Sequence, residues 1–249
     1  MTPYLSVILS AYNEADNLHR GSMNLMVDYL KEKDFSWELV IVNDGSTDDT
    51  SKLLHEFALG KLEIRVIDNP HMGKAAGIIT GAMAARGEII LFTDMDQATP
   101  IVELDKFLPK FKEGYSIVIG SRANREGAPM FRQILAQGQV IVRALILRLP
   151  FRDTQCGFKA FTHEAARKIF TLMNKINPPV VITGPAVTPG FDVELLYLGR
   201  KMGYRISEVP VSWRYQESRR VRFFKDMIDG LRGLFLVRLR SLTNAYKLG

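Results

Sequence analysis

The chain has 249 residues, of which 47% are hydrophobic and 24% are charged, and its formal net charge at pH 7 is +6. This length and apolar content argue against a disordered protein and predict one large domain, or one domain with a C-terminal extension. Cys156 is the only cysteine, so no internal disulfide can form, and we expect a reducing compartment such as the cytoplasm.

Neither an export signal nor a membrane span is predicted. Residues 1–14 lack a basic start and turn polar after one short apolar run, which argues against a signal peptide. A span needs about 20 apolar residues in a row, and the most apolar stretch, residues 139–151, is interrupted by Arg143 and Arg148. We therefore expect a chain that does not cross a bilayer.

Strand and helix patterns alternate in the first half of the chain. Continuous apolar runs predict strands at residues 5–10, 37–43, 62–67, 88–94 and 115–121. Helices are expected between them, at residues 14–33, 48–59, 74–86 and 102–112. This alternation predicts an α/β protein with a mostly parallel central sheet and helices on both faces. Ligands of such sheets bind beyond the carboxyl ends of the strands.

The second half is less regular. Its expected elements are a helix over 130–148, a short strand at 157–161, a helix over 163–171, a Pro/Gly-rich loop over 177–190, a helix from Phe191, a strand over 205–215 and an amphipathic helix over 220–240. Between Arg214 and Lys247 there are nine Lys/Arg and three acidic residues, an excess equal to the whole net charge. This basic tail indicates an anionic membrane surface, nucleic acid, a polyanionic substrate or only a solvated helix face.

Polar motifs follow the first two predicted strands. SAYNE (10–14) ends the first, and VNDGSTDDT (42–50) ends the second. Gly45 permits a tight turn, and Ser46 with Asp49 resembles a capping box. This is ordinary turn chemistry, but Asp44 at a strand end can also accept hydrogen bonds from a nucleobase or a ribose.

The stretch HMGKAAGIITGA (71–82) joins the third predicted strand to a helix. It lacks the phosphate-loop spacing of Walker-type NTPases, and no GxGxxG follows the first strand, which argues against a dinucleotide oxidoreductase. Gly73 and Lys74 at a helix start still suit an anion.

Two aspartates follow the fourth predicted strand, in FTDMDQATP (92–100). Asp94 and Asp96 offer hard oxygen ligands that suit Mg²⁺ or Mn²⁺, which usually bridge to substrate phosphates. The alternative is that Asp96 or Thr99 caps the helix that begins after Pro100.

Further charged residues lie at later strand and helix ends. Arg122 and Lys159 can compensate phosphate charge or form structural ion pairs, and Asp192 and Glu194 can cap an apolar helix. Cys156 is predicted to be a small buried residue, because no histidine lies near it in sequence. The four histidines show no ligand spacing, so no zinc site is expected.

Seven motifs in this order resemble the family 2 glycosyltransferases of GT-A fold: SAYNE, VNDGSTD, GKAAG, DMD, GSR, DTQCGFKAF and FDVELL. The resemblance covers residues 4–215 and is strongest to the polyprenyl-phosphate (dolichyl-phosphate) glucosyl- and mannosyltransferases. DTQCGFK is more typical of the glucosyltransferases. The resemblance implies a catalytic domain over residues 1–215. Residues 216–249 follow it as a basic amphipathic extension, whose mixture of aromatic, aliphatic and arginine residues suits a helix at an anionic membrane surface, with the protein peripheral at the cytoplasmic membrane face. The alternative is a helix packed on the sheet.

The resemblance also implies roles for individual residues. Those expected to bind a nucleoside-diphosphate sugar, UDP- or GDP-linked, are Ala11, Tyr12, Glu14, Asp44, Lys74, Gly77, Asp94 and Met95. Asp94, Asp96 and Gln97 are expected to hold Mg²⁺ or Mn²⁺, and Asp96 and Asp192 are the expected catalytic residues. Those expected to face phosphate or the acceptor are Arg122, Lys159, Arg219 and Arg220.

The implied reaction is the inverting transfer of a hexose, glucose from UDP-glucose, to a polyprenyl (dolichyl) phosphate. GDP-mannose as donor or a soluble saccharide acceptor are the alternatives. A sugar-nucleotide pyrophosphorylase would carry a Gly-rich loop in place of SAYNE, a regulator would bind nucleotide without turnover, and an RNP-type aromatic motif for nucleic acid is absent. A phosphate monoester has a second pKa of roughly 6. We therefore expect Asp192 to position the acceptor or the metal site and not to act as a base.

The sequence departs from the family at several points. Ser10 stands where many members have proline, ESRRVRF (217–223) replaces a Gly-Ser-Lys-like element, and the 177–190 loop is longer than usual. Members of this group commonly carry transmembrane helices, and none is expected in this sequence.

Overall fold

The structure is a computed structural model that describes residues 2–122, 140, 142–184, 188, 190–214 and 223–247, with the backbone alone for residues 223–229. The helix predicted over 130–148 is described only at residues 140 and 142–147, which are helical. The predicted phosphate partners Arg219 and Arg220 lie outside the described residues.

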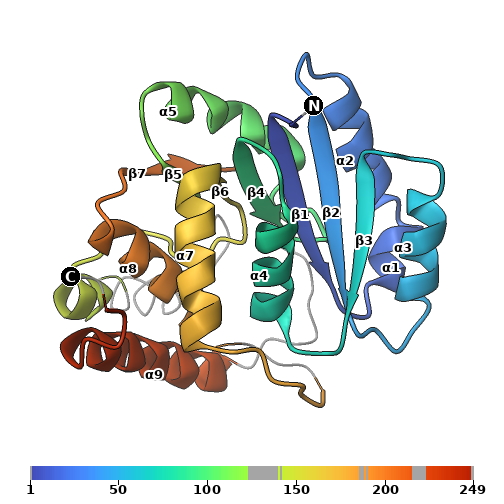
Figure 1. The fold of residues 1–249 in the computed structure, drawn as a ribbon. Helices are drawn as coiled ribbons and strands as arrows, with labels where there is room; N and C mark the ends of the chain where they lie inside the picture. Colours follow the sequence, from blue (N-terminus) through green and yellow to red (C-terminus); the bar gives the residue numbers. More distant parts are fainter. Residues whose placement is uncertain are drawn as a thin grey trace.

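A central sheet organises the described residues (Figure 1). Seven strands run in the order β3-β2-β1-β4-β6-β5-β7. Their bounds are β1 Leu5–Ala11, β2 Trp37–Asp44, β3 Ile64–Asn69, β4 Ile89–Thr93, β5 Ile117–Ser121, β6 Lys159–Thr162 and β7 Ile206–Pro210. β6 is antiparallel to β4 and to β5, and the other pairs are parallel. The predicted mostly parallel sheet is confirmed.

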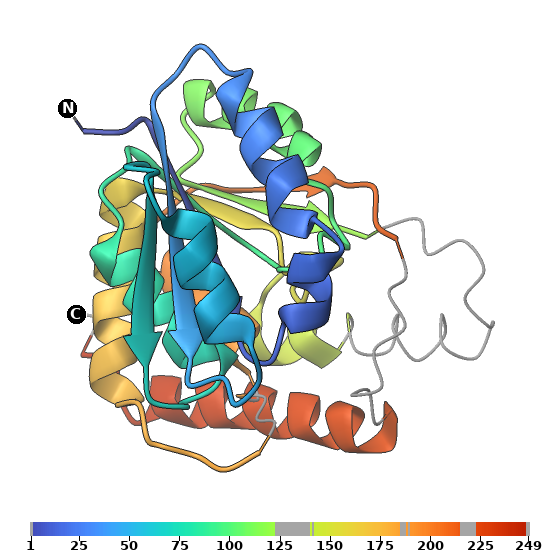
Figure 2. The same cartoon turned by 90° about the vertical axis from the view of Figure 1, so that its right-hand side faces the viewer.

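Helices cover both faces of the sheet (Figures 1 and 2). On one face lie α4 Lys74–Ala84, α7 His163–Ile176, α8 Phe191–Lys201 and α9 Phe223–Leu242. The other face carries α1 Ala15–His19, α2 Ser22–Lys31, α3 Thr50–Ala58, the 3₁₀ helix η1 Ile101–Lys106 and α5 Leu108–Lys112. Each face of the sheet has its own hydrophobic core: the first lies under α4, α7, α8 and α9, and the second lies under the helices of the other face. Along β1, Ile8 packs into the first core and Val7 and Leu9 pack into the second, because successive side chains of a strand point to opposite faces.

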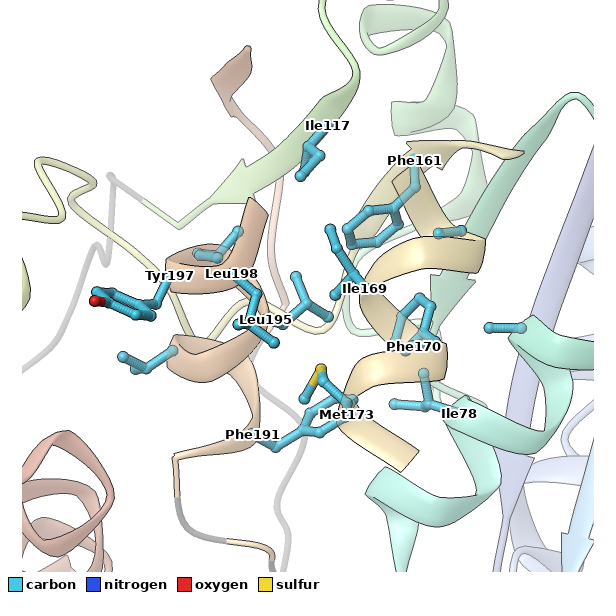
Figure 3. Packing of buried hydrophobic residues seen from close by; sticks show 14 of the residues in the cluster. Ile78, Ile117, Phe161, Ile169, Phe170, Met173, Phe191, Leu195, Tyr197 and Leu198 are labelled. Carbon is cyan, nitrogen blue, oxygen red and sulfur yellow. The ribbon is translucent and has the colours of Figure 1, made fainter. Parts of the chain in front are cut away.

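The first core joins α4, α7 and α8. Phe170 and Met173 of α7 lie between Ile78 of α4 and Leu195 of α8 (Figure 3). Leu234 and Val237 of α9 are buried in the same core, and so is Tyr246, which follows α9. The C-terminal helix is therefore packed against the sheet-bearing part of the protein.

Four predicted elements differ from the structure. The helix over 14–33 is two helices, because Gly21 has a left-handed φ of 77°, which ends a right-handed helix. The helix over 102–112 is a 3₁₀ helix followed by a short α-helix with Pro109 in its first turn. The strand over 205–215 ends at Pro210, and the helix over 163–171 continues to Ile176.

The predicted capping box of Ser46 and Asp49 is wrong. α3 begins at Thr50, and no side chain caps it at Asp49. Ser46 Oγ instead accepts from the N–H of Asn13 at 3.1 Å, so it joins the turn after β2 to the turn after β1.

Candidate active site

Most of the predicted site residues gather beyond the carboxyl ends of β1, β2 and β4, at the lower edge of the sheet in Figure 1. Lys74 opens α4 directly after the turn that follows β3, and its Nζ forms an ion pair with Asp94 Oδ1. A Cβ at residue 157 would overlap the Asp94 carboxylate, so only glycine fits at Gly157 without a shift. The turn before β6 thus lies directly against this carboxylate.

The charges around Asp94 act on one another. Burial alone would raise the pKa of Asp94, but Lys74 lowers it below its ordinary value, helped by Lys159 and Arg122. The pKa of Lys74 is raised against the effect of burial, by Asp94 first and by Asp192 and Asp96 as well. The structure therefore brings these predicted residues from five segments of the chain into one charged cluster.

The surroundings of Asp96 disfavour the ionised form of its carboxyl group. Burial raises its pKa, the N–H of Ala98 at 2.9 Å from Oδ1 opposes this, and the charge of Asp94 raises it further. Two neighbouring carboxylates with this repulsion suit a divalent cation, which would relieve it. Within the described residues no three acidic, histidine or cysteine side chains group around a metal position, so water and substrate phosphates would supply the remaining ligands.

The alternative that DMDQAT only caps a helix is not observed. η1 begins at Ile101 after Pro100, and neither Asp96 nor Thr99 accepts a hydrogen bond from its first amide. Gln97, with a left-handed φ of 50°, shapes the turn: its Nε2 donates to the Asp94 carbonyl at 3.0 Å, and its Oε1 accepts from Ile101 N at 3.1 Å. A metal-ligand role for Gln97 stays a prediction.

Asp44 ends β2 with its side chain 1% exposed. Its Oδ1 accepts from Met72 N at 2.9 Å, and its Oδ2 accepts from Gly73 N at 2.7 Å and from His71 Nδ1 at 2.8 Å. This carboxylate therefore holds the turn between β3 and α4 in place. A contact with a nucleobase or ribose stays a prediction.

Tyr12 lies beside this turn. Its ring stacks on the His71 ring, with 3.8 Å between centroids and 9° between planes. His71 was not among the predicted site residues, because its partners come from distant segments. One local signal could have indicated a role for His71: it lies two residues before Gly73, in the turn that is predicted to bind an anion.

The other predicted donor-site residues lie in the same region. Ala11 is the last residue of β1, and Gly77 lies so close to Ser10 that a Cβ would overlap the hydroxyl. Glu14 Oε2 accepts from Asn17 Nδ2 at 2.5 Å, and Met95 is buried between the two aspartates in sequence. Their contacts with a ligand stay predictions.

Arg122 and Lys159 form structural ion pairs in this structure. Arg122 binds Asp153 through two hydrogen bonds, of 2.6 Å to Oδ2 and 2.9 Å to Oδ1. Lys159 Nζ, which is fully buried, donates to Asp192 Oδ1 and to the Cys156 carbonyl, both at 2.5 Å. The sequence did not predict that Asp153 is the partner of Arg122. Phosphate contacts of the two cations stay predictions.

Cys156 is fully buried, and burial raises the pKa of its thiol. This confirms that it is a packing residue.

The two acids of α8 do different things. Neither caps the helix with a side-chain hydrogen bond at Gly190. Asp192 faces Lys159, whereas the buried Glu194 accepts from Arg240 Nη1 at 2.7 Å, from the Tyr246 hydroxyl at 2.8 Å and from Asn177 Nδ2 at 2.9 Å. Glu194 therefore ties α9 to α8.

Relatives and solved structures match most of this chain. It matches the sequence model of glycosyl transferase family 2 over residues 6–170. Dolichyl-phosphate beta-glucosyltransferase ALG5A of Trichomonas vaginalis is 34% identical over 98% of this chain and 76% of its own length. The human dolichyl-phosphate beta-glucosyltransferase is 32% identical over 99% of this chain and 78% of its own length. The resemblance carried by the seven motifs is confirmed.

Glucosyl-3-phosphoglycerate synthase of Mycobacterium tuberculosis with UDP superposes with a TM-score of 0.64 and 19% identity, over 95% of this chain and 80% of that one. Mannosyltransferase PcManGT of Pyrobaculum calidifontis with GDP-Man and Mn²⁺ gives a TM-score of 0.62 and 20% identity, over 96% of this chain and 65% of that one. These likenesses confirm the predicted GT-A fold, and the second neighbour holds a divalent metal with its nucleotide sugar.

Proposed function

Because the chain belongs to glycosyltransferase family 2, we propose that it transfers glucose from UDP-glucose to the phosphate of a polyprenyl carrier such as dolichyl phosphate. The observation that carries this proposal is the identity of 30–34% to dolichyl-phosphate beta-glucosyltransferases along nearly the whole chain. The charged cluster of Asp94, Asp96, Lys74 and Lys159 supports it, because a diphosphate leaving group needs both a cation site and compensating positive charge.

The residues fit a divalent cation. Asp94 and Asp96 would hold Mg²⁺ or Mn²⁺, and a bound ion there would supply charge stabilisation to the departing diphosphate. Lys74 is already paired with Asp94, so it would help set the position of that carboxylate and the charge balance around it.

Asp192 and Lys159 have a positioning role in this proposal. The acceptor phosphate is largely dianionic at neutral pH, since its second pKa is roughly 6, and it needs little deprotonation. The buried Lys159 holds the Asp192 carboxylate on one side of the cluster. The acceptor oxygen would attack the anomeric carbon as the bond to the diphosphate breaks on the opposite side, which inverts the configuration.

The reaction is tested by a panel of donors and acceptors. UDP-glucose, UDP-galactose and GDP-mannose are each supplied with a short polyprenyl phosphate, or with a soluble phosphoglycerate, in the presence of Mg²⁺ or Mn²⁺ and then EDTA. We expect transfer from UDP-glucose to the lipid phosphate that EDTA abolishes. Transfer only to the soluble acceptor, or only from GDP-mannose, would replace this proposal by one of the two alternatives.

The outer surface of α9 supports a membrane partner. Phe235, Leu239 and Leu242 have the i, i+4, i+7 spacing of one helix face, and they are 61%, 58% and 68% exposed. Leu234 and Val237, on the opposite face, are buried against the core. The helix therefore has two apolar faces, of which only one meets the protein.

The charges beside this outer stripe favour an anionic lipid surface. Arg232 and Arg238 are exposed and flank the stripe on either side, as in helices that lie in a membrane interface. α9 also lies on the side of the molecule where the strands β1–β3 end (Figures 1 and 2). A lipid-linked acceptor would then approach the site from the surface to which the protein binds. Among the described residues no helix is long and apolar enough to span a bilayer.

Liposome flotation tests this partner with point variants, because deletion of α9 would open the core. We expect the triple change Phe235→Ser, Leu239→Ser and Leu242→Ser to weaken binding to vesicles containing an anionic lipid by about 10-fold. Leu59→Ser with Leu62→Ser is the matched control, because these leucines are 82% and 92% exposed between α3 and β3, away from α9. Equal flotation of both variants would contradict the membrane role.

A further inference from the structure

The ring of His71 lies between three segments that are distant in sequence. Its Nδ1 lies 2.8 Å from Asp44 Oδ2 at the end of β2, and its Nε2 lies 2.8 Å from the carbonyl oxygen of Gly184. One face stacks on Tyr12, after β1. A second bond, from Ile182 N to the His71 carbonyl at 2.9 Å, fastens the same distant segment. We call residues 178–184, which follow α7, the strap.

The hydrogen bonds around His71 favour the doubly protonated form of its ring. The carbonyl of Gly184 can only accept, and both oxygens of Asp44 already accept backbone N–H groups. A neutral imidazole has one N–H and could satisfy only one of the two neighbours, with its other nitrogen facing an acceptor. The doubly protonated ring donates to both. The pKa of His71 is accordingly raised against the effect of burial, by the Gly184 carbonyl and by Asp44.

No other charged side chain competes for this ring in the described contacts. Asp44 is the ionisable group that β2 brings to it, and Tyr12 the one from the segment after β1. Lys74, three residues on, directs its Nζ to Asp94. Ile182 and Gly184 of the strap contribute backbone groups.

The neighbours of His71 are those expected to meet the donor. Tyr12 and Asp44 are the predicted nucleobase and ribose residues, and Lys74 begins the helix that is expected to face the diphosphate. A Cβ at Gly45 would approach His71 N to 2.6 Å, so the turn after β2 is built to let this histidine come close.

We propose that His71 is a positioning residue of the donor site, whose charged ring ties the strap to Asp44 and holds Tyr12 in one orientation for the nucleobase of a nucleoside diphosphate. The proposal rests on the proposed function for the identity of the ligand. The described contacts of the His71 ring are with Asp44, Gly184 and Tyr12 and not with Asp96 or Asp192. We therefore expect it to act on binding of the donor and to leave the rate of the bound complex largely unchanged.

Loss of the second N–H should release the strap. Above the pKa of His71 the Nε2 atom loses its proton and faces the Gly184 oxygen as an acceptor. Stability from this contact is therefore complete below the ordinary imidazole pKa and is lost as the pH rises through the raised value. Donor affinity should fall over the same interval.

Two substitutions separate the two ring nitrogens. The amide of His71→Asn can reach Asp44 as Nδ1 does, but it is too short for Gly184. The longer amide of His71→Gln can donate to Gly184 and does not titrate. His55→Asn is the matched control, because His55 also pairs with an aspartate, Asp68, at 2.8 Å, but lies exposed on α3.

The experiment measures the Kd of UDP and of GDP by calorimetry from pH 5.5 to 9, together with hydrogen exchange of the Ile182 amide. We expect the wild type and His55→Asn to bind about 10-fold more weakly at the upper end of the range. The protection of the Ile182 amide, relative to an unstructured amide at the same pH, should fall there as well. His71→Asn should be weak throughout, whereas His71→Gln should be tight and independent of pH, and kcat should change less than two- or threefold.

The same pH dependence in His71→Asn and in the wild type would overturn the proposal. So would a loss of thermal stability in His71→Asn with unchanged Kd, which would leave a purely structural histidine. Binding of nucleotide without transfer to a lipid phosphate would sink the proposed function alone. Binding of neither nucleotide would overturn the donor-site role, even where the exchange of Ile182 follows His71.

Discussion

Two carboxylate clusters lie at opposite ends of the same sheet, one buried and one partly exposed, and they differ in how their charge is balanced. At the amino ends of β1 and β2, Glu38 is 2% exposed and accepts from Ser6 Oγ at 2.6 Å, from three groups of Arg86 and from Arg65 at 3.1 Å. Burial opposes ionisation there, but these donors lower the pKa of Glu38. At the carboxyl ends, Asp96 lies beside a second carboxylate and its pKa is raised.

The difference separates a structural site from a reactive one. Every oxygen of Glu38 faces a donor of the protein, so nothing further is needed for its charge. At Asp94 and Asp96 the protein places like charges together. Lys74, Lys159 and Arg122 lower the pKa of Asp94, but the pKa of Asp96 stays raised. Such a cluster gains from a bound cation, whereas the Glu38 cluster does not.

The largest effect should come from Asp96→Asn, which removes one of the two repelling carboxylates. We expect kcat/KM for transfer to fall by about 1,000-fold, because half of the protein's cation site is lost. Steady-state kinetics with saturating Mn²⁺ would measure it, with thermal melting to show that the fold is kept. Near-normal turnover would mean that the cluster is structural, like that of Glu38.

The Glu38→Gln variant tests whether the cluster at the amino ends of the strands contributes to stability and not to catalysis. Loss of the buried charge opposite Arg65 and Arg86 should lower the free energy of unfolding by about 2 kcal/mol, a moderate value because both arginines stay partly hydrated. Urea unfolding would measure it. Turnover per folded molecule should stay unchanged, and a large fall in kcat would contradict the assignment of this cluster to stability.

Asp192→Asn should have a smaller effect on catalysis than Asp96→Asn. We expect a fall in kcat of about 10-fold, since the amide oxygen can still accept from Lys159 while the local charge balance changes. The pH profile of kcat is the second readout. If Asp192 were the general base, the fall would approach that of Asp96→Asn and the acid limb of the profile would disappear with it.

The smallest effect is the pH dependence of the Glu38 contribution. Its pKa in the folded protein lies below the ordinary value of 4.5. Its stabilisation is therefore fully present above pH 4.5 and is lost as the pH falls through the lower folded value. The difference in unfolding free energy between wild type and Glu38→Gln should be constant from pH 5 to 7 and shrink towards pH 3. A constant difference down to pH 3 would contradict it.

The parallel sheet could be predicted because its strands are continuous apolar runs and its helices are amphipathic, and both are local patterns. Because the carboxyl ends of parallel strands lie at the same edge of a sheet, the sequence also predicted that Asp44, Lys74 and Asp94 lie at that edge. The break at Gly21 was missed, since glycine within an apolar helix pattern carries no local mark of its left-handed φ. The place of β6 between β4 and β5 was also out of reach, because four residues carry too little pattern to specify non-local pairing.

Roles set by long-range hydrogen bonds could not be predicted. His71 has partners 27 and 113 residues away, and Glu194 has one 46 residues away in α9. Each is an ordinary residue in its local sequence. Asp153 and Glu208 are further cases: Asp153 holds Arg122, and Glu208 of β7 accepts from Asp153 N at 2.8 Å.

The reversed direction of β6 has a consequence for how this enzyme can vary. In an all-parallel sheet, only the residues that follow the carboxyl end of a strand lie at the edge that carries the candidate site. Lys159 enters β6 opposite Phe92 of β4 and Ile119 of β5, so a segment that arrives at the sheet also delivers side chains there. Changes in the length of the segment before Lys159 would alter the charged cluster, and changes after Thr162 would fall at the opposite end of the sheet. The segment before β6 can therefore change without any alteration of the strands that are proposed to bind the nucleotide.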